Sequence, residues 1–192
     1  MGRLIQNIGF LGRPVRTGEV ERILHGSVVH GIDLEQPLLG RTESLFAVVS
    51  QAERDSREMQ LPFETIAEGI EALFAYDGAY WNGNSIVRLE YLAGLPCPWG
   101  DFSTTTPLFP FDMQVREILL VHRERGFDLS SLQERYPTVK DLRKGYPGLV
   151  ADDEIMVFSE LHPHLLREHH FPEGKSTPYC VDFARAKKYL GI

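Results

Sequence analysis

The first 34 residues carry the pattern that most restricts the fold: a strand, a helix and a second strand separated by glycine turns. Residues 4–11 are largely apolar and end at a Gly-Arg-Pro turn, so they are predicted to form a strand. Thr17 can cap the helix that follows, and Gly26 can end it. The β-branched residues at 27–34 then predict a second strand. This order favours an α/β fold, a mixed sheet with flanking helices.

Two later stretches have the spacing of amphipathic helices. Apolar side chains recur at i, i+3, i+4 and i+7 from Leu45, and again from Phe63 after a proline. Each stretch therefore predicts a helix that turns one face to the core and a charged face to solvent. The other predicted elements are strands at 86–92 and 155–158, and helices at 111–123, 126–150 (short and broken) and 181–189.

Length and composition indicate one folded domain over residues 1–192. The chain has 192 residues, of which 43% are apolar, and it shows no internal repeat or linker. A chain of this length buries enough surface to fold without disulfides or metals. A chain with only two cysteines is typical of a reducing compartment. No apolar run reaches the roughly 20 residues of a membrane helix. We therefore expect a cytoplasmic protein with no membrane association.

The net charge excludes one broad class of function. Twenty Lys and Arg residues stand against 27 Asp and Glu residues, which gives a formal charge of −7. Nucleic-acid binding gains most of its affinity from cations that displace counterions on phosphates, so a general nucleic-acid binder is not expected. A local basic site for a single nucleotide remains compatible with this balance.

The turn after the first predicted strand is the candidate for this local nucleotide site. Gly12 allows the backbone to approach a ligand closely, while Arg13 and Arg16 place two guanidinium groups beside the N-terminus of the next helix. A helix N-terminus and an arginine fork both suit phosphate oxygens. The alternative is that both arginines are solvated surface charges.

Four stretches of the chain match one family in order. Residues 10–24 carry Gly12, Glu19 and an Ile-Leu pair in the family's N-terminal spacing, with Arg16 at the position of its phosphate-contacting lysine. Residues 32–37 match an Ile-Asp-Leu stretch and 92–102 match a Leu-x-Gly-Leu-Pro loop, while 171–177 are more weakly similar to a late Pro-x-Gly-x-x-x-Thr segment. In these stretches the chain resembles the inosine triphosphate pyrophosphatase family.

The resemblance implies a two-lobed α/β fold around a central cleft. It also implies a Mg²⁺-dependent enzyme that cleaves a purine nucleoside triphosphate to monophosphate and diphosphate. The residues expected to bind the nucleotide are Gly12, Arg13 and Arg16 at the phosphates, Trp99 and Phe102 beside the base, and Lys175 in the late segment.

The chain departs from the family at its acidic pair. Gly83 and Asn84 stand where the family has two carboxylates, and its C-terminal Ser-His-Arg is missing. Diphosphate cleavage needs carboxylates to hold Mg²⁺, so the catalytic site is either rebuilt or lost. The carboxylates that remain as catalytic candidates are Glu19, Asp33, Glu35, Asp77 and Asp101, with Glu19 and Glu35 as the expected metal ligands.

An acidic binding protein is the alternative from another class. A charge of −7 and the missing acidic pair suit a non-catalytic immunity or inhibitor protein that covers a basic target. A homodimer or another protein partner also stays open.

The stretch 160–170 offers a third interpretation, a metalloenzyme that holds zinc or iron. It concentrates four of the seven histidines, and Pro163 fits the first turn of a helix. On such a helix His164 and Glu168 share a face. The alternative is a set of surface histidines, and Cys97 is expected to be a buried, inert thiol. The side chains concerned are Glu160, His162, His164, Glu168, His169 and His170.

Overall fold

The computed structural model describes residues 17–26, 28–29, 32–33, 37–92, 97–101, 114–122 and 155–192. The predicted strand at 4–11 and the short helices at 126–150 lie outside these ranges. None of the helices in the described ranges is both long and apolar enough to cross a membrane. The elements are α1 (Thr17–His25), β1 (Val28–Val29), β2 (Ile32–Asp33), α2 (Leu45–Glu58), α3 (Phe63–Ala75), β3 (Tyr80–Trp81), β4 (Asn84–Leu92), β5 (Gln114–His122), β6 (Ile155–Ser159), α6 (His162–His169) and α7 (Phe183–Leu190).

The main sheet has the order β3-β4-β5-β6, and each neighbouring pair is antiparallel. β3 and β4 are joined by Asn82 and Gly83, whose φ angles of 44° and 77° are those of a tight hairpin turn. β4 and β5 pair over nine residues, from Asn84↔His122 to Leu92↔Gln114. The combination of helices with a sheet confirms the predicted α/β class, although the described strand pairs include no parallel one.

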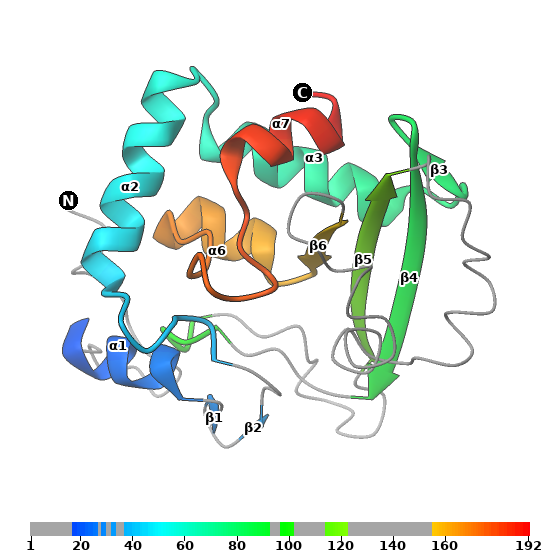
Figure 1. Ribbon diagram of the computed structural model, residues 1–192. Helices are drawn as coiled ribbons and strands as arrows, with labels where there is room; N and C mark the ends of the chain where they lie inside the picture. Colours follow the sequence, from blue (N-terminus) through cyan, green and yellow to red (C-terminus); the bar gives the residue numbers. More distant parts are fainter. Residues whose placement is uncertain are drawn as a thin grey trace.

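One apolar core lies between the helices and this sheet (Figure 1). Ile66 and Ile70 of α3 are fully buried, and they belong to one cluster with Leu120 of β5 and Phe158 of β6. Burial of each such side chain stabilises the fold by about 1.5–3 kcal/mol. α7 closes the cluster with Phe183, so the C-terminal helix contributes to the core around the sheet.

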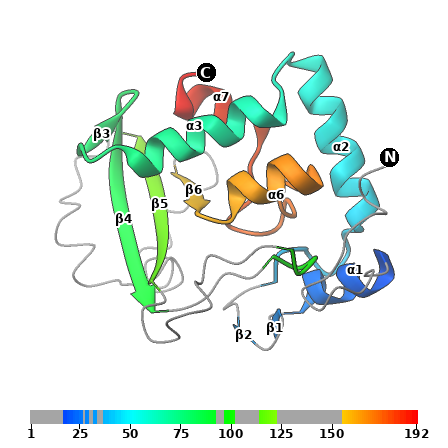
Figure 2. The ribbon, with the colours of Figure 1, turned by 180° about the vertical axis from the view of Figure 1, so that it is seen from behind.

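A second core joins α1, α2 and α6 to the segment 97–101. Its members include Leu24 of α1, Leu45 of α2, and Trp99, which is 2% exposed. α6 contributes Leu165 to this cluster and Leu166 to the first one. Both views place the segment 97–101 between α6 and α1 (Figures 1 and 2). α6 is therefore anchored on two sides, and its polar residues have fixed positions.

The predicted helices at Leu45 and Phe63 are confirmed, and their ends have local causes. Ser44 caps α2 by accepting a hydrogen bond from the backbone N–H of Ala47 at 3.2 Å. α7 confirms the predicted C-terminal helix, and Asp182 caps it in the same way. Strands were also correctly predicted at 86–92 and 155–158.

Two predictions of local structure are wrong. Within the expected helix at 111–123, the described residues 114–122 form strand β5. Its apolar run is buried on both faces of the sheet; Ile118 and Val121, for example, are 2% and 3% exposed. A strand buried on both faces loses the alternating pattern, and its apolar spacing can imitate a helix. Within the expected strand at 27–34, the described residues instead form the antiparallel pair β1 and β2, in which Val28 pairs with Asp33. Gly31 interrupts the β-branched run between these two strands.

Candidate metal centre

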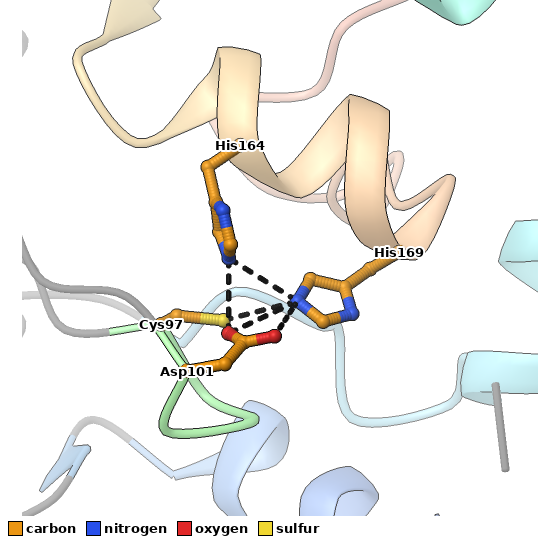
Figure 3. A group of neighbouring side chains, drawn as sticks. All are labelled: Cys97, Asp101, His164 and His169. Carbon is orange, nitrogen blue, oxygen red and sulfur yellow. Dashed lines mark hydrogen bonds and ion pairs between the residues drawn. The ribbon is translucent and has the colours of Figure 1, made fainter. Parts of the chain in front are cut away.

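Four side chains of the types that bind metals converge at the edge of the second core. They are Cys97 and Asp101 from one short segment, and His164 and His169 from α6 (Figure 3). The four donor atoms all lie within 4.8 Å of one another. The two pairs come from parts of the chain more than 60 residues apart, since Asp101 and His164 are separated by 63 positions.

A tight turn brings the first two side chains together. The backbone N–H of Gly100 donates to the carbonyl of Cys97 at 2.8 Å, and Gly100 has a φ of 76°. That left-handed conformation is open to glycine and strained for other residues. It directs the chain back, so that the Asp101 carboxylate lies beside the Cys97 thiol (Figure 3).

The helix and the core fix the two histidines. Pro163 occupies the first turn of α6, as predicted, and His169 is the last helical residue. The indole of Trp99 stacks on the His169 ring, with centroids 3.9 Å apart and planes 7° from parallel. The side chain of His169 is fully buried, and its Nε2 faces the other three donors (Figure 3).

The donor atoms are close enough to one another to share one cation. The Nε2 atom of His169 lies 3.3 Å from Cys97 Sγ and 3.3 Å from His164 Nε2. Asp101 Oδ1 is 3.0 Å from His164 Nε2, and Asp101 Oδ2 is 3.2 Å from His169 Nε2. A tetrahedral zinc ion with ordinary bond lengths places its N, O and S ligands about 3.3–3.6 Å from each other. These four distances are at or just below that range, and all the donor atoms lie within 4.8 Å of one another, so small side-chain movements would bring them to the spacing of one ion.

Burial and neighbouring groups shift the protonation of these side chains. Burial raises the pKa of the Cys97 thiol, and the hydrogen bond to the Asp101 carboxylate and its negative charge raise it further. Hydrogen bonds from the backbone at Trp99 and Asp101 act in the other direction but are smaller. Burial also lowers the pKa of His169, which keeps its ring neutral, the form that binds metals. For Asp101 burial opposes ionisation, but hydrogen bonds from His164, His169 and Cys97 outweigh it and lower its pKa.

The surface-histidine alternative is wrong for His162 and His169, which are 0% and 3% exposed. His162 belongs to a separate buried group: its Nδ1 accepts the backbone N–H of Ser159 at 2.8 Å, and its Nε2 lies 3.0 Å from Glu173 Oε1. This group has the composition of a Ser-His-Glu triad, but Nδ1 is already occupied and cannot take the Ser159 hydroxyl proton. We therefore assign it a structural role.

The residues expected from the family resemblance are spread over the molecule. Glu19 is exposed on α1 and Asp77 is exposed after α3, and these segments lie on opposite sides of the structure (Figure 1). Asp33 pairs through its backbone in β2. Trp99 is a core residue that stacks on a histidine, and Lys175 is exposed, with its backbone N–H bonded to Glu43. Gly12, Arg13, Arg16, Glu35 and Phe102 lie outside the described residues.

The candidate metal centre differs from the pair that the sequence suggested. His164 was expected to work with Glu168, yet Glu168 is exposed and His169 is the partner. Residues five apart point about 140° away from each other on a helix, so this pair is not a same-face pattern. The signal that was available is the spacing Cys-x₃-Asp followed by His-x₄-His, which lies within the range for zinc ligands.

Comparison with known proteins adds no assignment. No family model matches the chain, and neither a curated protein nor a solved structure is significantly similar to it.

Proposed function

We propose that this chain is a zinc-binding protein in which Cys97, Asp101, His164 and His169 hold a single Zn²⁺. The observation that carries the proposal is the convergence of one sulfur, two nitrogens and a carboxylate within 4.8 Å, with Cys97 and His169 buried. Buried polar groups of this kind are stable only when they are paired or bind a metal.

The donor set selects the metal. Thiolate and imidazole are ligands for Zn²⁺ and, less selectively, for iron and copper, whereas Mg²⁺ prefers oxygen. One thiolate and one carboxylate also balance the two charges of Zn²⁺ when both imidazoles are neutral. The Mg²⁺ expected from the family resemblance would therefore have to bind elsewhere.

The proposed ion has a clear structural effect. It connects the segment 97–101 to α6, elements that are 63 to 72 positions apart in the chain. Four protein ligands are typical of structural zinc sites, and zinc binding then contributes directly to the free energy of folding. The ion would fix the second core, to which Cys97 and Trp99 already belong.

Metal analysis of the purified protein tests the proposal. We expect about one zinc per chain, and loss of that zinc in Cys97→Ser and His169→Asn. The matched control is Cys180→Ser, because Cys180 is the other cysteine and lies outside the four-residue group. Wild-type protein that retains no zinc after gel filtration in zinc-containing buffer would contradict the proposal. Equal zinc content in Cys97→Ser and wild type would also contradict it.

Nucleotide hydrolysis remains a separate proposal that rests on the sequence resemblance. Release of diphosphate from inosine triphosphate with Mg²⁺ would support it. The absence of any thermal shift with nucleotides would favour the acidic partner-binding alternative.

A further inference from the structure

The four proposed ligands differ in how deeply they are buried. Cys97 is 0% exposed, and the side chain of His169 is also 0% exposed. The His164 side chain is 14% exposed and that of Asp101 is 26% exposed. The carboxylate is therefore the ligand on the solvent side of the centre, and water reaches it first.

The four ligands also differ in their support. His164 and His169 are held by helix α6, and Trp99 stacks on His169. Within the described part of the chain, the hydrogen-bond and ion-pair partners of the Asp101 carboxylate all belong to the centre itself: His164, His169 and Cys97. Metal ligands that stay in place are normally oriented by hydrogen bonds from outside the centre. Asp101 has no such restraint from the described residues.

Charge determines what can take the place of Asp101. Zn²⁺ with the Cys97 thiolate and two neutral imidazoles carries one positive charge. A small monoanion restores neutrality in the same way as the carboxylate. Without Asp101 the ion would keep three protein ligands, one cysteine and two histidines, which is the number found in open zinc sites.

We infer that Asp101 is an exchangeable ligand, which closes the zinc centre at rest and gives way to a small external monoanion. This inference rests on the zinc centre proposed above. The closed site then becomes a site with a single exchangeable position, in which Cys97, His164 and His169 are the permanent ligands.

Cobalt substitution with azide as the probe tests this exchange. Wild-type protein loaded with Co²⁺ should show visible bands of a tetrahedral thiolate complex, and azide should change them in a saturable way. Asp101→Ala should keep its cobalt and bind azide more tightly. A tethered carboxylate competes at an effective concentration of about millimolar or higher, so its removal should lower the azide dissociation constant by roughly tenfold or more.

The control is Glu168→Gln, which removes an exposed carboxylate next to His169 that is not one of the four ligands. It should bind azide as wild type does. Two results would overturn the inference: cobalt-loaded wild type whose spectrum does not respond to azide, or a folded Asp101→Ala protein that has lost its cobalt. Wild type that binds no cobalt or zinc would instead refute the proposed function itself.

Discussion

Replacement of Trp99 by alanine should weaken both the fold and the metal centre. Trp99 is 2% exposed, stacks on His169 at 3.9 Å, and packs edge-on against Phe171 with centroids 5.7 Å apart. Truncation of a buried aromatic side chain to alanine costs about 3–5 kcal/mol. Loss of the stacking partner also frees the His169 ring, and such loss of orientation lowers metal affinity roughly 10- to 100-fold, or about 1.4–2.8 kcal/mol.

The two effects can be separated by measuring the stability twice. Urea unfolding of wild type and Trp99→Ala is followed once with saturating zinc and once with a chelator. A chelator competition then gives the zinc dissociation constants directly. If Trp99 positions His169, the substitution costs more in the zinc-loaded protein, and the excess equals the loss of binding free energy.

The control for packing alone is Leu45→Ala. Leu45 belongs to the same apolar cluster and is 1% exposed, but it is not one of the ring partners of His169. Its substitution should cost the same free energy of unfolding with and without zinc. Should Trp99→Ala behave like Leu45→Ala in this respect, the indole only fills the core and the positioning role is wrong.

Three further substitutions and treatments test single features. Gly100→Ala should lower the free energy of unfolding by about 1 kcal/mol and weaken zinc binding. Gly83 has a similar φ of 77°, so Gly83→Ala should lower the free energy of unfolding by about as much but leave the zinc affinity unchanged. The hydrogen bond from Arg167 lowers the pKa of Glu71, so the pair stabilises the fold above pH 4.5 and loses this effect as pH falls through the lower, folded pKa. With a chelator present, the free energy of unfolding of Glu71→Gln should therefore fall by about 0.5 kcal/mol less than that of wild type on acid titration. The difference is small because the pair is exposed. Burial raises the pKa of Cys180 to about 12, so at pH 8 iodoacetamide should modify it far more slowly than a free thiol, as mass spectrometry would show.

The elements that could be predicted are those whose causes are local. α2 starts at a serine cap and repeats apolar residues along one face, and α3 follows a proline, so both helices can be located from neighbouring residues. β5 could not be predicted, because its strand conformation depends on pairing with β4 and β6 and on burial of both its faces. The antiparallel pair of β1 and β2 was missed because Gly31 was treated as part of a strand.

The members of the metal centre could be recognised singly but not as a group. His164 was considered as a ligand and Asp101 as a catalytic carboxylate, while Cys97 was correctly predicted to be buried. Their meeting depends on how the segment 97–101 packs against α6, which is a tertiary event. The correct partner, His169, was also hidden by a spacing that does not place two side chains on one helix face.

The donors and acceptors around His169 favour a cation over a network of protons alone. Its Nε2 atom has three neighbours within 3.3 Å: the Cys97 sulfur, the Asp101 carboxylate and the His164 Nε2. A neutral imidazole nitrogen has either one proton or one lone pair, so it can make one good hydrogen bond there. Protons alone can satisfy the carboxylate, since His164, His169 and Cys97 can each donate a hydrogen bond to Asp101. That network makes the 3.3 Å contacts of His169 Nε2 with the Cys97 sulfur and with His164 Nε2 contacts between donors. A single ion between the four side chains would accept a lone pair from each of them and would give these two contacts an attractive cause.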